Sequence, residues 1–572
     1  MIAQVVFDLP IDGPFDYCIP PHLVEKTAVG MRVKVSFGAK SRTGFVVGLL
    51  AQSAIPQLKS LQALVDTSAA FNALDLAFAQ DFSAYYGCSL GGTLFTMHRS
   101  QKTLQPSLRR EAKPLVSLYR SSVGRYAAKI QEIMDGYRRL QAPRFLILVP
   151  DAFRATTLSQ QLKCEGTLKV GTRSSVFECE GRLTCVIMVD DEDASYKQEQ
   201  MPMYETRDVL LMRAKIYGFD TVFIGTSLSP ELMALNRAGG AKLIDETAPH
   251  TPLITAVDLS NYKFMPGMVS PPVYDALQAA LKAGKKSILV LNRRGSYRIT
   301  RCGNCEEVLK CSRCDSGLIY SRSAGKYLCR HCTSTAPGDV ICPKCRQSNW
   351  RSKGIGVEQI QAELKKYFPQ AKIVAFERGA KSPGAFDILV STQAVLRFQG
   401  IWQVHMATFI DFDAELNRLD MRSSCNAFSL ARHISDMTLE RVFIQTRDIN
   451  HYVVKSLKAN DSQGFYDEEL RLRKEFGFSP FKHWVKITLR ARSEKSAQET
   501  SAQVYNQLKK TAPAHYAVMP PLADGVARRR DQFLFNVMVQ TDQVRGAVAF
   551  IKSALGQIKR PSRVCVTLNV DP

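Results

Sequence analysis

The sequence lacks the segments that place a protein in or across a membrane. No apolar run approaches the roughly 18 residues that a membrane helix needs. The opening MIAQVVFDLP carries an acid where a signal peptide has a basic end followed by an apolar run. Internal repeats are also missing, and 45% hydrophobic residues exclude the disordered, collagen-like and low-complexity classes. We therefore expect a cytoplasmic protein without membrane contact, and 572 residues suggest three or four domains.

Acidic residues are scarce relative to basic ones. The chain has 53 Asp and Glu against 76 Lys and Arg, which gives a formal net charge of +23. Such a surplus attracts anionic partners, of which nucleic acid is the commonest. The alternative is that the charge reflects a generally basic proteome and no dedicated anionic partner.

Cysteine is frequent for a chain without a secretion signal, and it is unevenly distributed. Eight of the 15 cysteines lie within 44 residues as four C-x-x-C pairs, separated by 5, 14 and 9 residues. Two residues between cysteines let both thiolates reach one tetrahedral ion at about 2.3 Å, so four pairs predict two four-thiolate zinc sites. Iron–sulfur ligation and ordinary buried or redox cysteines are the alternatives, and spacing alone permits several pairings. The eight are Cys302, Cys305, Cys311, Cys314, Cys329, Cys332, Cys342 and Cys345.

The spacing of apolar residues predicts several regions. The first 60 residues show the alternation of short strands, and the segment before residue 99 has helical spacing. From residue 115 apolar strands alternate with helical segments, which indicates parallel α/β sheets. The predicted strands are RFLILVP (144–150), LTCVIMVD (183–190), TVFIGTS (221–227), SILVLN (287–292), KIVAFE (372–377), DILVST (387–392), MATFIDFD (406–413) and RVFIQT (441–446). The predicted regions are an N-terminal domain at 1–100, a linker at 101–114, a first lobe at 115–258, a second lobe at 259–455 with a cysteine-rich insertion at 301–348, and an α+β domain at 456–572.

Several motifs, in order along the chain, resemble the PriA family of primosomal replication-restart helicases. This resemblance implies two RecA-like helicase lobes with an inserted two-zinc, eight-cysteine module. It also implies a small β-rich DNA-binding domain before the lobes and an α+β domain after them. The motifs are VDDEDASYKQE (189–199), IGTSLSPE (224–231), LNRRGSYRITRCGNC (291–305), ILVSTQ (388–393), FIDFDAELNRLDMRSS (409–424) and the terminal VTLNVDP.

The resemblance also assigns roles to individual residues. The family's N-terminal domain binds the last base of a 3′ DNA end, and the matching residues are Phe15, Asp16, Tyr17, Gly38 and Lys59. An aromatic ring can stack on the base, a carboxylate can accept from its amino edge, and a lysine can meet phosphate. The alternative is that Phe15 and Tyr17 are core residues of a strand.

The zinc ligands and a basic run complete these assignments. By resemblance one zinc ion takes Cys302, Cys305, Cys342 and Cys345, and the other takes Cys311, Cys314, Cys329 and Cys332. Arg528, Arg529 and Arg530 are candidates for contact with duplex phosphate. The alternative for this run is a solvated loop.

The motor motifs depart from the family pattern. A phosphate loop needs G-x-x-x-x-G-K-[ST], whereas residues 119–126 place Tyr119 at the first glycine, Arg125 at the lysine and Tyr126 at the magnesium ligand. Only Gly124 is retained, and the alternative that these residues favour is the ordinary start of a helix. In the acidic run Asp190-Asp191-Glu192-Asp193, either Val189 or Asp190 takes the key aspartate position, according to the alignment.

The arginine-finger motif is altered as well. FSLARHIS (428–435) stands in its place, with Arg432 on the first arginine and Ser435 on the second. Loss of a finger alone typically costs roughly 10³–10⁵ in rate. With a degenerate nucleotide site at Gly124, Arg125, Asp190 and Asp191, there is little reason to expect ATP binding or hydrolysis. The family's winged-helix domain has no counterpart, and the short pattern is similar to a motor-degenerate actinobacterial branch.

We therefore expect a nucleoid-associated, monomeric replication-restart protein that binds branched DNA with a 3′ end at stalled forks. The expected partners are other primosome proteins, the replicative helicase or its loader, and single-stranded DNA-binding protein. Two alternatives remain open: an active ATP-dependent 3′-to-5′ helicase with an atypical nucleotide site, and a zinc-dependent protein-interaction module.

Overall fold

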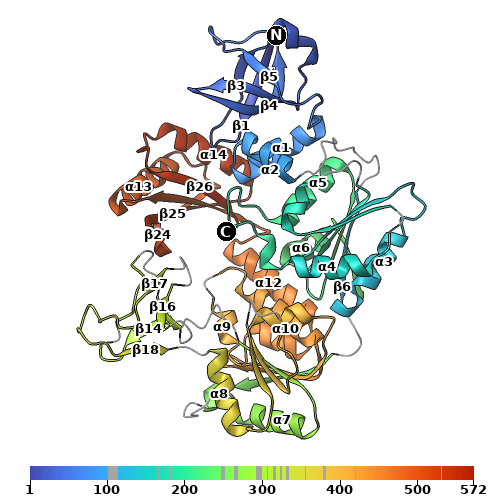
Figure 1. Cartoon of the computed structure of the whole chain (residues 1–572), viewed down its shortest axis with the longest axis vertical. Coiled ribbons are helices and arrows are strands. Elements are labelled where there is room, and N and C mark those ends of the chain that lie inside the picture. The colour runs from blue at the N-terminus through green and yellow to red at the C-terminus, as the bar shows by residue number, and fades with distance from the viewer. Residues whose placement is uncertain are drawn as a thin grey trace.

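The described residues of the computed structural model form six sheets, arranged as an elongated stack with the N-terminal sheet at one end (Figure 1). No described helix is long and apolar enough to cross a membrane. The model describes residues 1–572 except 101–113, 165, 179–182, 247–250, 263–267, 292–298, 306, 313–316, 322–324, 330–333, 354–355, 378–381, 419 and 530.

The N-terminal sheet is antiparallel, with strand order β2-β1-β4-β3-β5. Alternating apolar residues of β1 and β3 pack inward, as the sequence pattern predicts. Two helices follow the sheet, and Asn72 caps the first through a reciprocal capping box with Asp75. The elements are β1 (Ile2–Phe7), β2 (Phe15–Cys18), β3 (Arg32–Phe37), β4 (Lys40–Leu50), β5 (Leu61–Leu64), α1 (Ala73–Tyr86) and α2 (Leu90–Ser100).

The first lobe is a six-stranded sheet of order β11-β6-β10-β9-β7-β8, and all its strand pairs are parallel. Its central strands β9 and β10 are completely buried, which explains their continuous apolar runs. The elements are β6 (Val116–Ser121), α3 (Tyr126–Asp135), β7 (Arg144–Leu148), α4 (Ala152–Gln161), β8 (Thr167–Gly171), β9 (Cys185–Val189), α5 (Thr206–Tyr217), β10 (Asp220–Gly225), α6 (Pro230–Arg237) and β11 (Lys242–Glu246).

The second lobe is another six-stranded parallel sheet, of order β12-β22-β21-β13-β20-β19. The predicted first lobe, 115–258, ends too late, because its last residues form strand β12. This strand pairs with β22 of the second sheet and not with the first sheet. The elements are β12 (Leu253–Asp258), α7 (Pro271–Lys282), β13 (Ser287–Val290), α8 (Val357–Tyr367), β19 (Ile373–Phe376), β20 (Ile388–Ser391), β21 (Val404–Phe409), α9 (Asp413–Leu416), α10 (Ser423–Asp436), β22 (Thr438–Thr446) and α11 (Tyr452–Lys458).

The cysteine-rich module lies between β13 and α8 in the chain and projects beside the second lobe (Figure 1). Its strands are short, and its apolar cluster is small, so the module has little core of its own. The elements are β14 (Ile299–Cys302), β15 (Ile319–Ser321), β16 (Lys326–Leu328), β17 (Thr335–Ala336) and β18 (Trp350–Lys353).

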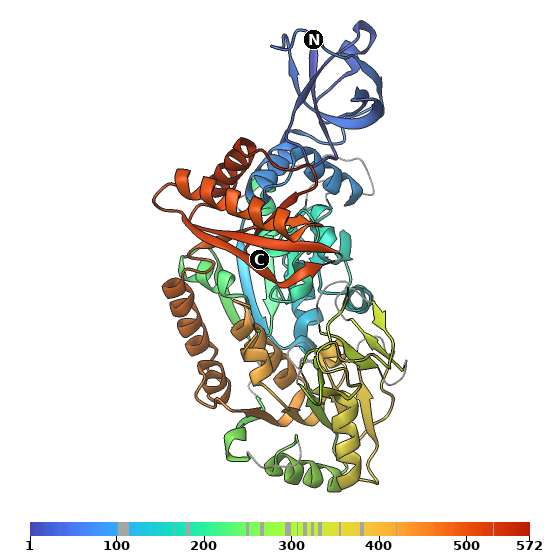
Figure 2. The same ribbon diagram turned by 90° about the vertical axis from the view of Figure 1, so that its left-hand side faces the viewer.

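The C-terminal region has β-α-β-β-α-β connectivity and strand order β24-β25-β23-β26, a ferredoxin-like arrangement. Helices α13 (Glu494–Thr511) and α14 (Val544–Gln557) lie over one face of the antiparallel sheet (Figure 2). The domain contacts the N-terminal helices, since Arg545 Nε donates to Asp81 Oδ1 at 2.6 Å. The elements are α12 (Ser462–Phe476), β23 (His483–Ala491), α13 (Glu494–Thr511), β24 (Ala517–Arg529), β25 (Gln532–Thr541), α14 (Val544–Gln557) and β26 (Cys565–Val570).

Candidate functional site

The predicted 3′-end residues gather around β2 and the β3–β4 turn, but on two faces of the sheet. Tyr17 is only 5% exposed and donates its hydroxyl to the Ser36 carbonyl at 3.1 Å, so its ring belongs to the core. Phe15 lies on the same face and packs against Phe37 at 5.1 Å between ring centroids. This placement agrees with the alternative role of the two aromatic residues, and only the partly exposed Phe15 keeps ring surface for stacking.

The polar members of the group have different surroundings. Asp16 projects from the opposite face of β2, where its carboxylate accepts from Ser53 Oγ at 2.5 Å and Gln4 Nε2 at 3.3 Å. Lys59 and Gly38 lie together, because Lys59 Nζ donates to the Gly38 carbonyl at 3.2 Å. Gly38 is exposed in the left-handed region at φ +60°, with open space where a Cβ would stand.

One group of four thiols converges in the cysteine-rich module. The Sγ atoms of Cys302, Cys305, Cys342 and Cys345 lie within 4.8 Å of one another. The Cys302–Cys345 and Cys305–Cys342 separations are 3.4 and 3.6 Å, close to the ~3.8 Å between thiolates around one tetrahedral zinc. The backbone N–H of Asn304 lowers the pKa of the Cys302 thiol to about 7, which favours the thiolate. This group could hold a metal ion.

The second predicted thiol group is only partly within the described residues. Cys311 and Cys329 are buried in the small cluster of the module, and the Cys311 sulfur lies 2.9 Å from Ser334 Oγ. Cys314 and Cys332 lie outside the described residues.

The arginine run lies at the end of β24. Arg528 and Arg529 pair through their backbones with Phe533 and Gln532, close to the turn into β25. Their side chains and the whole of Arg530 lie outside the described residues.

Residues 119–126, the predicted position of a degenerate phosphate loop, run from the end of strand β6 to the first residue of helix α3. The tyrosine at the magnesium-ligand position fills this region, since the buried Tyr126 hydroxyl donates to Asp190 Oδ1 at 2.7 Å. Arg154 Nη1 donates to the other oxygen of Asp190 at 2.6 Å. Burial and the Asp190 charge raise the pKa of Tyr126 well above its ordinary value, so the phenol keeps its proton.

The position of Asp190 bears on the two alignments left open by the sequence. Val189 is the last residue of β9 and lies in the core, whereas Asp190 follows the strand and faces the start of α3. Gly124 and Arg125 are exposed. Asp191 points elsewhere, where its Oδ1 accepts from the Ser229 backbone N–H at 3.2 Å. Burial, followed by the charge of Glu192, raises the pKa of Asp191 to about 7.

Direct hydrogen bonds join the two lobes over this region. From the second lobe, Asp436 accepts from the Val123 backbone N–H at 3.0 Å, and Ser429 Oγ donates to Glu192 at 3.0 Å. Arg154 Nη2 of the first lobe donates to Gln399 at 3.2 Å. Such bonds contribute about 0.5–1.5 kcal/mol each, and about 1.5–3 kcal/mol where a charged group takes part.

The predicted finger Arg432 does not take part in these bonds. Its Nη1 donates to Asn460 Oδ1 at 2.6 Å, and Ser435 bonds back to the Ala431 carbonyl of its own helix. The adjacent His433, which sequence reasoning missed, enters the interface: its Nδ1 lies 3.2 Å from Thr226 Oγ1 of the first lobe.

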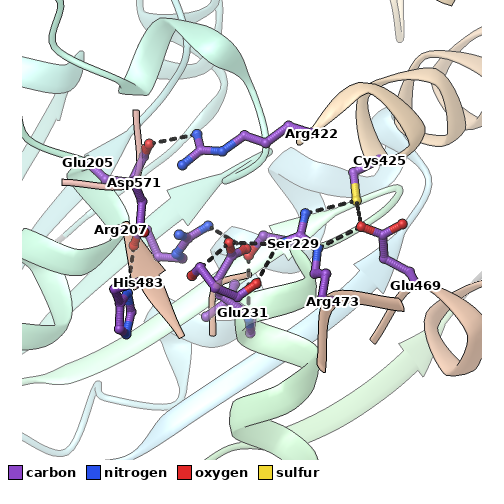
Figure 3. A network of polar contacts seen from close by, with 12 residues as sticks. Glu205, Arg207, Ser229, Glu231, Arg422, Cys425, Glu469, Arg473, His483 and Asp571 are labelled. Atoms are coloured by element: carbon purple, nitrogen blue, oxygen red, sulfur yellow. Dashed lines mark hydrogen bonds and ion pairs between the residues drawn. The ribbon is translucent and has the colours of Figure 1, made fainter. Parts of the chain in front are cut away.

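A second buried network joins the lobes to the C-terminal region (Figure 3). Arg473 of α12 bonds Glu231 of the first lobe at 3.0 Å and Glu469 at 2.6 Å. Arg422 of the second lobe bonds Glu205 of the first at 3.1 Å. Removing one member of a buried pair costs about 3–5 kcal/mol, because the remaining charge is left uncompensated. The network therefore fixes how these parts sit together.

Comparisons with known proteins agree with these features. The family model of the PriA 3′ DNA-binding domain matches residues 4–98. The Bacillus subtilis replication restart protein PriA is 26% identical over 436 residues, which cover 71% of this chain and 54% of that protein. The chain thus spans about half the length of that relative.

Other relatives align from end to end. The PriA proteins of Treponema pallidum and Rickettsia conorii are 23% and 22% identical, and each alignment covers 100% of this chain and 99% of the relative. A solved structure of the helicase MrfA bound to DNA has 12% identity and a TM-score of 0.32, covering 68% of this chain and 54% of that one, a likeness too low to support an argument. This chain is similar to the PriA family of replication restart proteins, both in its N-terminal domain and in its two end-to-end alignments.

Proposed function

We propose that this protein binds branched DNA at stalled forks and promotes reloading of the replicative helicase, without an ATP-driven motor of its own. The observation that carries the proposal is the occupation of the degenerate nucleotide site by protein groups. The Tyr126 phenol and the Arg154 guanidinium already satisfy both oxygens of Asp190. A magnesium-bound nucleotide would have to fit against a carboxylate that already accepts two buried, charge-assisted hydrogen bonds, beside a tyrosine in place of the small magnesium ligand.

The bonds between the lobes support the same conclusion. A motor of this class opens and closes the cleft between its lobes as it binds and hydrolyses ATP. Here the Val123–Asp436, Arg154–Gln399 and Ser429–Glu192 bonds hold that cleft together without nucleotide. The lobes would then act as a rigid platform that positions the DNA-binding domain, the cysteine-rich module and the C-terminal domain.

The proposal assigns DNA and metal contacts as follows. Phe15, Asp16, Gly38 and Lys59 would meet the 3′ end, and the basic run at 528–530 would meet duplex phosphate. The eight module cysteines would hold two zinc ions and present a surface for primosome proteins, the helicase or its loader, or single-stranded DNA-binding protein.

An ATPase assay with forked DNA tests the absence of a motor. We expect no DNA-stimulated hydrolysis by the wild-type protein. Stimulated turnover that is abolished by Asp190→Asn would refute the proposal and establish the alternative, an active helicase with an atypical nucleotide site.

A binding assay tests the DNA end. Forks with an exposed 3′-OH should bind more tightly than plain duplex, and Asp16→Ala should remove this difference while duplex binding is unchanged. Asp8→Ala is the matched control, because it removes an acid of the same domain that pairs only with Arg99 among the described contacts. A wild-type protein with no preference for the 3′ end would favour the zinc-dependent protein-interaction alternative.

A further inference from the structure

Three metal-ligating side chains from the two lobes converge beside the filled nucleotide site. They are Asp190 and Glu192 of the first lobe and His433 of α10, and one ligand atom of each lies within 4.8 Å of the others. Their side chains are 1%, 9% and 7% exposed. His433 Nε2 lies 3.4 Å from Glu192 Oε1 and 4.0 Å from Asp190 Oδ1.

Glu192 has an oxygen that protein groups leave unsatisfied. Its Oε1 accepts from Ser227 Oγ at 2.7 Å and from Ser429 Oγ at 3.0 Å. Its Oε2 is buried and has no hydrogen-bond partner among the described residues. An unsatisfied carboxylate oxygen in a buried interface is costly, and a bound cation is a chemically suitable partner for it.

The 3.4 Å between His433 and Glu192 matches the separation of ligands around one ion, whereas the 4.0 Å between His433 and Asp190 is longer. Around a tetrahedral ion with bonds of about 2.1 Å, ligand atoms lie roughly 3.4 Å apart. Asp190 can keep its bonds to Tyr126 and Arg154, since a carboxylate oxygen accepts more than one partner. The Thr226 hydroxyl lies 3.2 Å from His433 Nδ1. It can accept a hydrogen bond from the N–H that a metal-bound imidazole keeps on that nitrogen.

We propose that Asp190, Glu192 and His433 form a site for a divalent transition-metal ion that joins the two lobes without nucleotide. An imidazole with two carboxylates suits manganese, iron or zinc, whereas magnesium takes oxygen ligands. The inference rests on the proposed loss of the motor, because a nucleotide cycle would require the lobes to separate at His433.

The competing arrangement is a hydrogen-bonded interface without metal. Gln399 Nε2 lies 2.9 Å from His433 Nδ1 and would donate to it, which leaves the ring proton on Nε2, directed at the carboxylates. The two arrangements place the imidazole proton on different nitrogens, so only one of them binds a cation.

Manganese binding to the full-length, zinc-loaded protein without nucleotide distinguishes them. Electron paramagnetic resonance of free Mn²⁺ counts the bound ion, and thiolate sites are poor ligands for it. We expect one saturable equivalent per chain. Glu192→Gln, which keeps the shape of the side chain, and His433→Gln should abolish it, and Thr226→Val should weaken it roughly 10–100-fold.

Asp193→Asn is the matched control, because it removes one charge from the same acidic run without removing a proposed ligand. Its Mn²⁺ affinity should stay within about twofold of the wild type. The proposal is overturned if wild-type protein shows no saturable binding, or if a folded Glu192→Gln variant binds as the wild type does. ATP hydrolysis would refute the proposed function and with it the metal site, whereas a lack of saturable Mn²⁺ binding in protein that hydrolyses no ATP would overturn the metal site alone.

Discussion

Removal of a single hydroxyl group, by Tyr126→Phe, tests whether the nucleotide site is closed by the protein itself. The phenol is fully buried and donates to the Asp190 carboxylate at 2.7 Å. A hydrogen bond to a charged group contributes about 1.5–3 kcal/mol, and its loss leaves a buried carboxylate with one partner fewer. We therefore expect the free energy of local opening around α3 and β9 to fall by about 1.5–3 kcal/mol.

Amide hydrogen exchange is the suitable assay, because a chain with several domains does not unfold in one step. Where exchange follows the opening equilibrium, this loss corresponds to roughly 10- to 150-fold faster exchange of the α3 and β9 amides. Amides of the C-terminal domain, far along the chain from the change, should exchange at the wild-type rate.

Tyr119→Phe provides the matched control. Tyr119 lies on β6 and packs in the same apolar cluster, but no hydrogen bond of its hydroxyl occurs among the described contacts. Its substitution should change the opening free energy by no more than about 0.5 kcal/mol. Equal exchange rates in the two variants would refute the idea that the Tyr126–Asp190 bond holds the site closed.

Three further predictions concern the framework. His483 shares a hydrogen bond with the side-chain carboxylate of Asp571, which raises the pKa of His483 although burial opposes this. The contribution of His483 to stability should therefore be complete below about pH 6.5 and be lost as the pH rises through the pKa of the folded state. Melting temperatures of wild type and His483→Gln should converge at high pH, and a constant difference would contradict this. Arg473→Gln should lower the free energy of local opening around α12 by about 3–5 kcal/mol, because it breaks the buried network, whereas the exposed Arg471→Gln should leave amide exchange of α12 nearly unchanged. Cys302→Ser should lower bound zinc by one equivalent in metal analysis, and the exposed Cys565→Ser should not.

Much of the fold could be predicted from the sequence, because buried strands carry their signal locally. Every predicted strand of the two lobes appears, as β7, β9 and β10 in the first and β13 and β19 to β22 in the second. The lobe strands that were not predicted are β6, β8, β11 and β12. Strands β8 and β11 are sheet edges with charged residues, so their half-covered faces give no continuous apolar run. The pairing of β12 with β22, across most of the second lobe's sequence, has no local signal either.

The candidate sites also differ in whether local sequence is enough to predict them. The thiol group was recognisable because its ligands come as short C-x-x-C pairs, and a tight turn brings each pair together. The position of Asp16 on the opposite face from Tyr17 follows from strand alternation, which a family resemblance does not reveal. His433 could not be found this way, since its contact with Thr226 joins residues 207 positions apart.

Under the proposed loss of the motor, the substitutions at the predicted nucleotide site form one consistent set. A tyrosine in place of the small magnesium ligand reaches the aspartate that would otherwise hold the ion, so the aspartate gains a permanent partner. An arginine from α4 neutralises its charge and continues to Gln399 in the other lobe. A histidine beside the former finger then meets the remaining acid across the interface. Because each group satisfies the next, restoring any one motif residue alone would leave buried charges unpaired, and so would not be expected to recover a motor.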